Sequence, residues 1–197
     1  IINGFIAGFN FIFRRKSVDR YFPERKTFIS KMALAIAAIP FLGVLHGITL
    51  GRFNFKIHLD RIFFDDLPQA FDGLRILQIS DVHCGSILER DRDKIEEAVR
   101  LINEQNADLI VFTGDLVNNF GDEVDPWIDV LNKIKKAPFG NFAVMGNHDY
   151  GEYTRWKSEM AKKANLEKIK SAFGKIGFDL LLNEHVSLTK NNESIKL

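Results

Sequence analysis

The stretch that decides the fold is Leu74-Arg75-Ile76-Leu77-Gln78-Ile79-Ser80-Asp81-Val82-His83. An apolar run of this length is typical of an inner strand of a parallel sheet, covered on both faces. It ends in Asp81 and His83, which are two residues apart and therefore point to the same side of an extended backbone. A carboxylate beside an imidazole supplies ligands of the kind that transition metals bind. The stretch therefore predicts a buried strand that ends in metal ligands.

The same arrangement recurs twice along the chain. A second apolar run, 109–113, ends in Gly114-Asp115-Leu116-Val117-Asn118, and a third, 142–145, ends in Gly146-Asn147-His148-Asp149. In open α/β sheets, ligands bind at the carboxyl ends of the strands. Three such clusters in order therefore predict one ligand-binding site at the carboxyl ends of the strands.

Between and after these clusters, apolar residues recur at helical spacing and form three core-facing stripes. They are Ile95, Ala98, Val99 and Ile102; Trp127, Val130, Leu131 and Ile134; and Leu166, Ile169, Phe173 and Ile176. Asp125-Pro126 reads as the N-cap and first residue of the second helix. Strands alternating with helices across short links predict an α/β fold, a parallel sheet covered by helices.

Further strands are expected on either side of this core. The alternation of Phe53, Phe55, Ile57 and Leu59 predicts an antiparallel strand within 53–67. After Gly177, strands are predicted at 180–182 and 186–188, with Asn191-Asn192 turning a hairpin into 194–197.

Composition narrows the classes of function. The chain has 197 residues, 46% of them hydrophobic, and a formal net charge of +1. This length accommodates one domain and an accessory segment. A charge near zero gives no argument for a nucleic-acid partner, so none is predicted. The single cysteine, Cys84, excludes an internal disulfide, and without a second cysteine it reads as a small buried hydrophobe rather than a zinc ligand.

The N-terminal region predicts attachment to a membrane. Residues 32–51 are predicted to be a transmembrane helix, because Met32 to Leu50 contains no Asp, Glu, Lys or Arg. A cleaved export signal is the main alternative. Residues 1–13 are apolar and begin with Ile, so they are expected to be the end of a truncated transmembrane segment. The excess of Lys and Arg in the connector 14–31 predicts that it lies in the cytoplasm and that everything after Gly51 lies on the far side of the membrane. The same connector could also contact anionic lipid headgroups.

The three clusters carry a resemblance to a known family. The order Asp81-x-His83, Gly114-Asp115-x-x-Asn118, Gly146-Asn147-His148-Asp149 resembles the calcineurin-like metallophosphoesterases. The flanking Gln78-Ile79-Ser80 and Tyr150-Gly151 look most like their bacterial, membrane-attached branch. The resemblance covers the chain from Phe71 onward, so 52–197 is interpreted as the N-terminal part of a metallophosphoesterase domain.

The resemblance implies a site with two metal ions, drawn from Mn, Fe or Zn. The implied ligands are Asp81, His83 and Asp115 for the first ion, and Asp115 and Asn147 for the second. His148 is implied to act on the leaving group, with Asn118 where the family usually has a carboxylate. Either His148 is then a weaker acid, or the substrate has a good leaving group. Asp149 is expected to anchor its loop through backbone hydrogen bonds rather than to bind metal.

The expected activity is a membrane-anchored hydrolysis of phosphate ester or pyrophosphate bonds by a metal-bridging hydroxide, on a lipid-linked or envelope substrate. The family completes its site with further histidines. Here only His185 follows His148, and its setting does not read as a ligand loop. The chain is therefore expected to hold about half the site and to be inactive alone. A catalytically degenerate, membrane-tethered binding or structural protein is the alternative. Dinucleotide binding would require a Gly-x-Gly-x-x-Gly after the first strand, which is missing.

Overall fold

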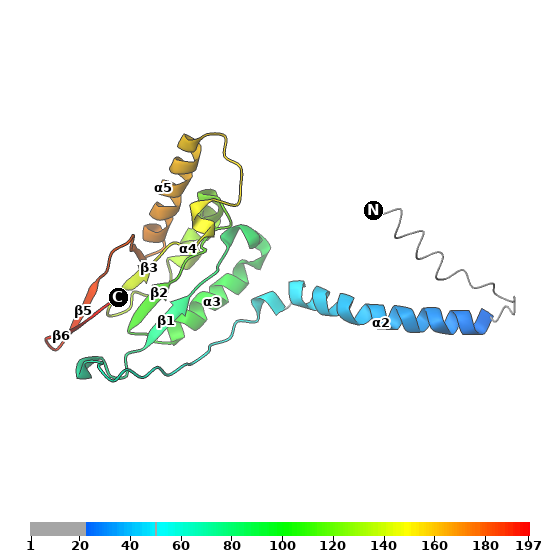
Figure 1. Ribbon diagram of the computed structural model, residues 1–197, viewed down its shortest axis with the longest axis horizontal. Helices are drawn as coiled ribbons and strands as arrows, with labels where there is room; N and C mark the ends of the chain where they lie inside the picture. Colours follow the sequence, from blue (N-terminus) through cyan, green and yellow to red (C-terminus); the bar gives the residue numbers. More distant parts are fainter. Residues whose placement is uncertain (1–22, 50) are drawn as a thin grey trace. The chain divides into compact units, whose positions relative to one another are not determined.

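The structure is a computed structural model, and it describes residues 23–49 and 51–197 (Figure 1). The chain divides into two compact units, the first ending at Lys56 and the second running from Ile57 to Leu197. The predicted segment 1–13 and the first part of the connector 14–31 lie outside the described residues.

The described part of the first unit is mainly one long helix. Helix α2 (Pro23–Thr49) contains Pro40 and is followed by the 3₁₀ turn η1 (Gly51–Phe53). Its described side chains are all exposed except that of Ala38, which is half-buried. Among the described residues, α2 belongs to the one helical stretch long and apolar enough to cross a membrane. From Met32 to Thr49 the helix contains no Asp, Glu, Lys or Arg, so the apolar part of α2 is long enough to be a candidate membrane span.

The second unit is built on a four-stranded parallel sheet in the order β1-β2-β3-β4. The strands are β1 (Ile76–Ile79), β2 (Leu109–Phe112), β3 (Asn141–Ala143) and β4 (Asp179–Leu180). The connections contain helices α3 (Arg92–Glu104), α4 (Ile128–Leu131) and α5 (Glu159–Lys175). A hairpin of β5 (Ser187–Lys190) and β6 (Glu193–Lys196) closes the described chain. The predicted α/β fold and the predicted hairpin at Asn191-Asn192 are confirmed.

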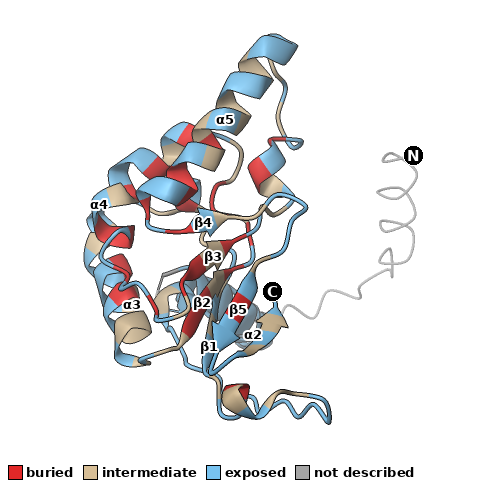
Figure 2. Ribbon diagram, turned by 90° about the vertical axis from the view of Figure 1, so that its left-hand side faces the viewer, coloured by how far each residue is buried: buried red, intermediate tan, exposed pale blue. Residues whose placement is uncertain are grey.

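The two faces of the sheet are covered by different elements. On one face, Leu109 packs with Phe71 and with Leu188 of the hairpin. On the other, Phe112 makes edge-to-face contacts with Phe173 and Phe178, at 5.6 and 5.7 Å between ring centroids. Figure 2 shows α3 and α4 on one side of the sheet and β5 on the other. The alternation along β2 thus fills two separate layers of core.

The register of the sheet brings the three polar clusters together at the carboxyl ends of the strands. Ile79 pairs with Phe112, and Phe112 with Ala143, so the chain leaves all three strands at nearly the same level. The segments that begin at Ser80, Thr113 and Val144 therefore start side by side.

Three local predictions are wrong. Among the described residues, β1 is an outer strand of the sheet rather than an inner one, and Ile76 is 54% exposed. Residues 53–67 form no strand, because no described strand lies beside them to complete a ladder of hydrogen bonds. The helix expected from Asp125-Pro126 is instead the 3₁₀ helix η5 (Gly121–Trp127) followed by the short α4. Asp125 does not cap a helix, because its carboxylate pairs with Lys168 at 2.6 Å.

Candidate metal centre

The backbone at the strand ends is strained where ligands were predicted. Asp81, His83 and Asp115 have φ values of 55°, 47° and 59°, in the left-handed region that non-glycine residues seldom adopt. Each such residue costs about 1–3 kcal/mol and persists only where the surrounding structure enforces it, and such residues gather at functional sites. The strain indicates that the chain turns sharply here to aim these side chains.

Asp149 organises the loop that follows β2. Its carboxylate is fully buried and accepts hydrogen bonds from the main-chain N–H groups of Gly146, Asp115, Leu116 and Val117, at 2.9 to 3.2 Å. Burial raises the pKa of the Asp149 carboxyl above its usual range, although the four N–H donors act in the opposite direction. The prediction that Asp149 anchors the loop is confirmed.

A second carboxylate, that of Glu123, continues this support. It accepts hydrogen bonds from the N–H groups of Asn118, Asn119 and Phe120, at 2.6 to 3.1 Å. The last of these is the bond that an N3 glutamate makes to the N-cap residue in a capping box. Phe120 has no side-chain acceptor to complete the box, so the usual sequence signal for this glutamate is missing.

The loop after β1 is in turn attached to the loop after β2. The N–H groups of Asp81, His83 and Cys84 donate to the carbonyls of Gly114, Asp115 and Leu116, at 2.9 to 3.1 Å. The carbonyl groups of the loop after β2 therefore bind the loop after β1, while the N–H groups of the loop after β2 bind Asp149.

The glycines of the second and third clusters allow their backbones to touch. Gly114 has a φ of +95°, and a Cβ there would lie 2.1 Å from the nitrogen of Gly146. A side chain at this position would separate the loops after β2 and β3, so glycine is required by space as well as by conformation.

The side chains of the first two clusters converge. The Nε2 of His83 lies 3.7 Å from Asp115 Oδ2 and 3.8 Å from Asp81 Oδ1. His83, Asp115 and His148 each place a possible ligand atom within 4.8 Å of the others. Two ligands of one ion, each about 2.1 Å from it, are separated by about 3.0–3.5 Å. The spacings are too long for hydrogen bonds and close to those around a shared ion, so the residues fit a metal.

His148 is held on three sides. Its main-chain N–H donates to Asp115 Oδ1 at 2.9 Å. Its ring contacts that of His83 edge to face, with 4.7 Å between the ring centroids. The ring Nδ1 lies 2.9 Å from the main-chain carbonyl of Asn118. A carbonyl only accepts, so Nδ1 carries a proton in this contact and Nε2 is the ring nitrogen that the contact leaves available. The side chain of Asn118 instead contacts the hydroxyl of Ser86, at 3.1 Å from Nδ2 and 3.3 Å from Oδ1.

Asn147, a predicted ligand of the second ion, is hydrogen-bonded to a tyrosine. Its side chain is exposed, and its Nδ2 donates to the hydroxyl of Tyr153 at 2.8 Å. The ring of Tyr153 stacks on that of His148, with centroids 4.5 Å apart. Sequence reasoning missed Tyr153, because it follows no strand and belongs to no motif.

The remaining candidates behave as expected. Cys84 is 1% exposed, and burial, with the nearby Glu123 carboxylate, raises the pKa of its thiol to about 12. It is therefore a buried apolar residue rather than a reactive thiolate. His185 is exposed and does not belong to the described metal-ligand group.

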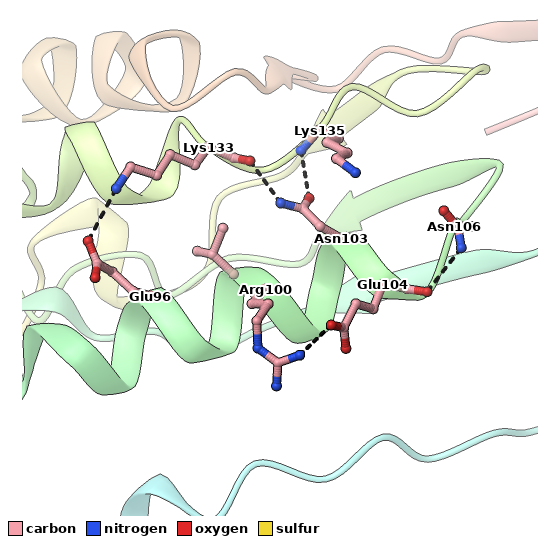
Figure 3. Close-up of a pocket in the computed structure, with 8 residues that line it drawn as sticks. Glu96, Arg100, Asn103, Glu104, Asn106, Lys133 and Lys135 are labelled. Atoms are coloured by element: carbon pink, nitrogen blue, oxygen red, sulfur yellow. Dashed lines mark hydrogen bonds and ion pairs between the residues drawn. The ribbon is translucent and has the colours of Figure 1, made fainter.

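A surface hollow elsewhere in the fold has a structural explanation. Figure 3 shows that it lies along α3 and the segment before β3. Glu96 pairs with Lys133 at 3.2 Å, and the Asn103 amide bonds the main chain at Lys133 and Lys135. Asn106, which also lines it, precedes β2 and so belongs to the opposite edge of the sheet from the metal centre. The contacts across the hollow join α3 to the loop before β3. Among the described residues, the group of possible metal ligands lies elsewhere.

Several known proteins are similar in sequence to part of this chain. An uncharacterized metallophosphoesterase, YkuE of Bacillus subtilis, is 38% identical over 44% of this chain and 30% of its own length. A transmembrane protein with metallophosphoesterase domain from Danio rerio is 29% identical over 63% of this chain and 25% of its own length. The UDP-2,3-diacylglucosamine pyrophosphatase LpxG of Chlamydia trachomatis is 36% identical over 45% of this chain and 27% of its own length. The chain thus matches less than a third of the length of each of these relatives.

The family model for calcineurin-like phosphoesterases matches residues 74–194, which begin at β1 and include all three ligand clusters. The match covers more than half of the chain, and it agrees with the parallel α/β sheet that the structure shows. The chain belongs to the calcineurin-like phosphoesterases.

Proposed function

We propose that the protein is a membrane-anchored, metal-dependent phosphoesterase. The observation that carries the proposal is the convergence of Asp81, His83, Asp115 and His148 at the carboxyl ends of the strands, the first three of them on left-handed backbone. Members of the family generally bind two metal ions and act on phosphate esters, which agrees with a site of carboxylate, imidazole and amide groups.

Each residue has a role in this proposal. Asp81, His83 and Asp115 hold the first ion, while Asp115 and Asn147 hold the second. Bound ions, of Mn, Fe or Zn, would neutralise the phosphoryl oxygens and lower the pKa of a water molecule. The Nδ1–H of His148 donates to the carbonyl of Asn118, which fixes the ring. Nε2, when protonated, then donates its proton to the leaving oxygen and is left as the unprotonated nitrogen. The proposed catalytic pair is thus His148 and the backbone of Asn118.

The proposed substrate is a pyrophosphate or phosphate ester linked to a lipid. LpxG, which is 36% identical over 45% of this chain, is named as a pyrophosphatase of UDP-2,3-diacylglucosamine, a diacylated nucleotide sugar. The apolar helix α2 and the transmembrane relative from Danio rerio suggest membrane association. We place the transmembrane helix at 32–51, the basic connector 14–31 in the cytoplasm and the metallophosphoesterase domain on the extracytoplasmic side. Reporter fusions after Gly51 test this orientation.

Hydrolysis by the whole protein tests the activity. In detergent with Mn²⁺, we expect release of product from p-nitrophenyl phosphate, from its bis ester or from UDP-2,3-diacylglucosamine, and loss of that release in Asp115→Asn. The exposed Asp60→Asn serves as the matched control. A protein that leaves all three compounds intact, with Mn²⁺ bound, would refute the proposal.

A second candidate function is supported by Asn118 and by the small number of ligands in the described chain. The protein would then be a catalytically degenerate, membrane-tethered binding or structural protein on the same scaffold. The same assay separates the two, because this candidate predicts bound Mn²⁺ with no hydrolysis of any of the three compounds.

A further inference from the structure

Tyr153 connects two of the proposed functional residues through two different interactions. Its hydroxyl accepts a hydrogen bond from Asn147 Nδ2 at 2.8 Å, and its ring lies on the imidazole of His148 at 4.5 Å and 27° between planes. Asn147 and His148 are adjacent in sequence, but their side chains do different work in the proposed function. A single side chain that contacts both can fix their relative placement.

The hydrogen bond decides which end of the Asn147 amide is free. An amide has one oxygen that can bind a metal and one nitrogen that cannot. With Nδ2 engaged by the Tyr153 hydroxyl, Oδ1 is the group left to face an ion. Hydrogen bonds of this kind orient metal ligands, and their loss typically weakens metal affinity by about 10–100-fold.

The stack restrains the imidazole of His148 on the face that the other contacts leave open. The ring edge is fixed through Nδ1 by the Asn118 carbonyl, and His83 meets the ring at nearly a right angle, 89°. Tyr153 adds a parallel contact, so rotation of the imidazole out of the site would have to displace an aromatic ring.

The segment that carries Tyr153 is anchored on both sides. The Trp156 Nε1 donates to the carbonyl of Gly151 at 2.7 Å, and its ring contacts that of Phe120 at 5.4 Å. Glu152 forms an ion pair with Lys162 of α5 at 2.6 Å. Tyr153 itself is 61% exposed, so its position is set by these neighbours and not by burial of its own ring.

From these contacts we propose that Tyr153 is a positioning residue of the metal centre, which turns the Asn147 oxygen toward the second ion and holds His148 beside the leaving group. The inference rests on the proposed function. It assigns to an exposed tyrosine outside the three clusters a part in both metal binding and leaving-group departure.

Two substitutions separate the two contacts in the whole protein. Tyr153→Phe keeps the ring and removes the hydroxyl, whereas Tyr153→Leu removes both. Titration with Mn²⁺ alone, followed by calorimetry, should show two ions bound by the wild type and the second bound about tenfold more weakly by either variant. The neighbouring, exposed Tyr150→Phe removes a hydroxyl as a control and should bind both ions as the wild type does.

Leaving-group dependence tests the stack. At saturating Mn²⁺, Tyr153→Leu should hydrolyse phenyl phosphate much more slowly than the wild type does. Its rate on p-nitrophenyl phosphate should fall less, because p-nitrophenolate departs without needing a proton from His148. Tyr153→Phe should lose equally little on both. Wild-type affinity for the second ion in Tyr153→Phe, or an equal loss on both esters in Tyr153→Leu, would overturn the inference while leaving the proposed function standing. A wild type that binds no Mn²⁺ would overturn both.

Discussion

The loops after β1 and β2 both carry proposed ligands on left-handed backbone, but they are held in different ways. In the loop after β2, Asp149 and Glu123 accept seven hydrogen bonds from main-chain N–H groups, six of them from residues 115–120. The loop after β1 depends on three bonds to the carbonyls of the other loop. The side chain of Asp115 is 13% exposed and that of Asp81 is 66% exposed.

The difference implies an order of dependence within the site. Asp149 fixes the loop after β2, and that loop then positions the loop after β1. Replacing Asp149 should therefore alter the positions of the proposed ligands in both loops, whereas replacing Asp81 should alter only the loop after β1.

The largest effect is expected from Asp149→Ala. Four main-chain N–H groups would lose their acceptor, and each buried unsatisfied group costs about 1–3 kcal/mol. We expect the free energy of unfolding to fall by about 3–5 kcal/mol, since water can reach part of the site. Urea unfolding of the metal-free protein, followed by tryptophan fluorescence, measures it.

The exposed Asp60→Ala is the matched control and should change the free energy of unfolding by less than about 0.5 kcal/mol. If Asp149→Ala costs no more than its control, the loops are not organised by this carboxylate.

Gly85→Ala tests the contact between the first loop and Glu123. A Cβ at Gly85 would lie 2.4 Å from Glu123 Oε2, and Glu123 cannot move without releasing its N–H donors. We expect a loss of about 1–3 kcal/mol in the free energy of unfolding. At Gly174, in α5, nothing lies within 4 Å of the added carbon, so Gly174→Ala should be neutral or slightly stabilising. Equal effects at the two glycines would contradict this account.

The thiol of Cys84 predicts a pH dependence. Its pKa of about 12 in the folded protein lies above the value of about 8.5 in an unfolded chain. The thiolate therefore forms only in the unfolded state between these values, and stability is complete below the lower value and lost as pH rises. From about pH 8 to about pH 9.5 the wild type should lose about 1 kcal/mol more than Cys84→Ala. Parallel pH profiles for the two proteins would show that the thiol is not shielded.

The smallest effect on stability is expected from Asp81→Gly. Glycine adopts the left-handed conformation without strain, so the metal-free protein should change by less than about 1 kcal/mol, in the stabilising direction. Its affinity for Mn²⁺ should nevertheless fall, because a ligand is lost. Asn106→Gly replaces another left-handed residue at the opposite edge of the sheet and should leave that affinity unchanged. A large loss of stability in Asp81→Gly would mean that the first loop organises the second.

Much of this arrangement could be predicted from the sequence, because it follows from the ends of parallel strands. Asp81, His83 and Asp115 each come directly after an apolar run, and the register of the sheet then brings the ends of β1 and β2 together. The family motif added His148 and Asn147, and the anchoring by Asp149 was also expected. The roles of these residues in metal binding and catalysis remain predictions.

The other features depend on neighbours that no local pattern reveals. The alternation at 53–59 indicates a face to be covered, but a strand also requires a partner for its hydrogen bonds, which the described residues do not supply. Tyr153 contacts the site through a turn whose course is set by Trp156 and Phe120. The motif drew attention to the side chain of Asn118, whereas its main-chain carbonyl is what meets His148.

The left-handed residues also bear on how such a protein could be engineered. Asp81, His83 and Asp115 occupy positions where glycine or asparagine would relieve the backbone. Selecting a mutant library for heat resistance alone would favour those replacements and remove the proposed ligands. The more stable variants would therefore be expected to lose the proposed activity. A useful screen must therefore measure the proposed hydrolysis and thermal stability together.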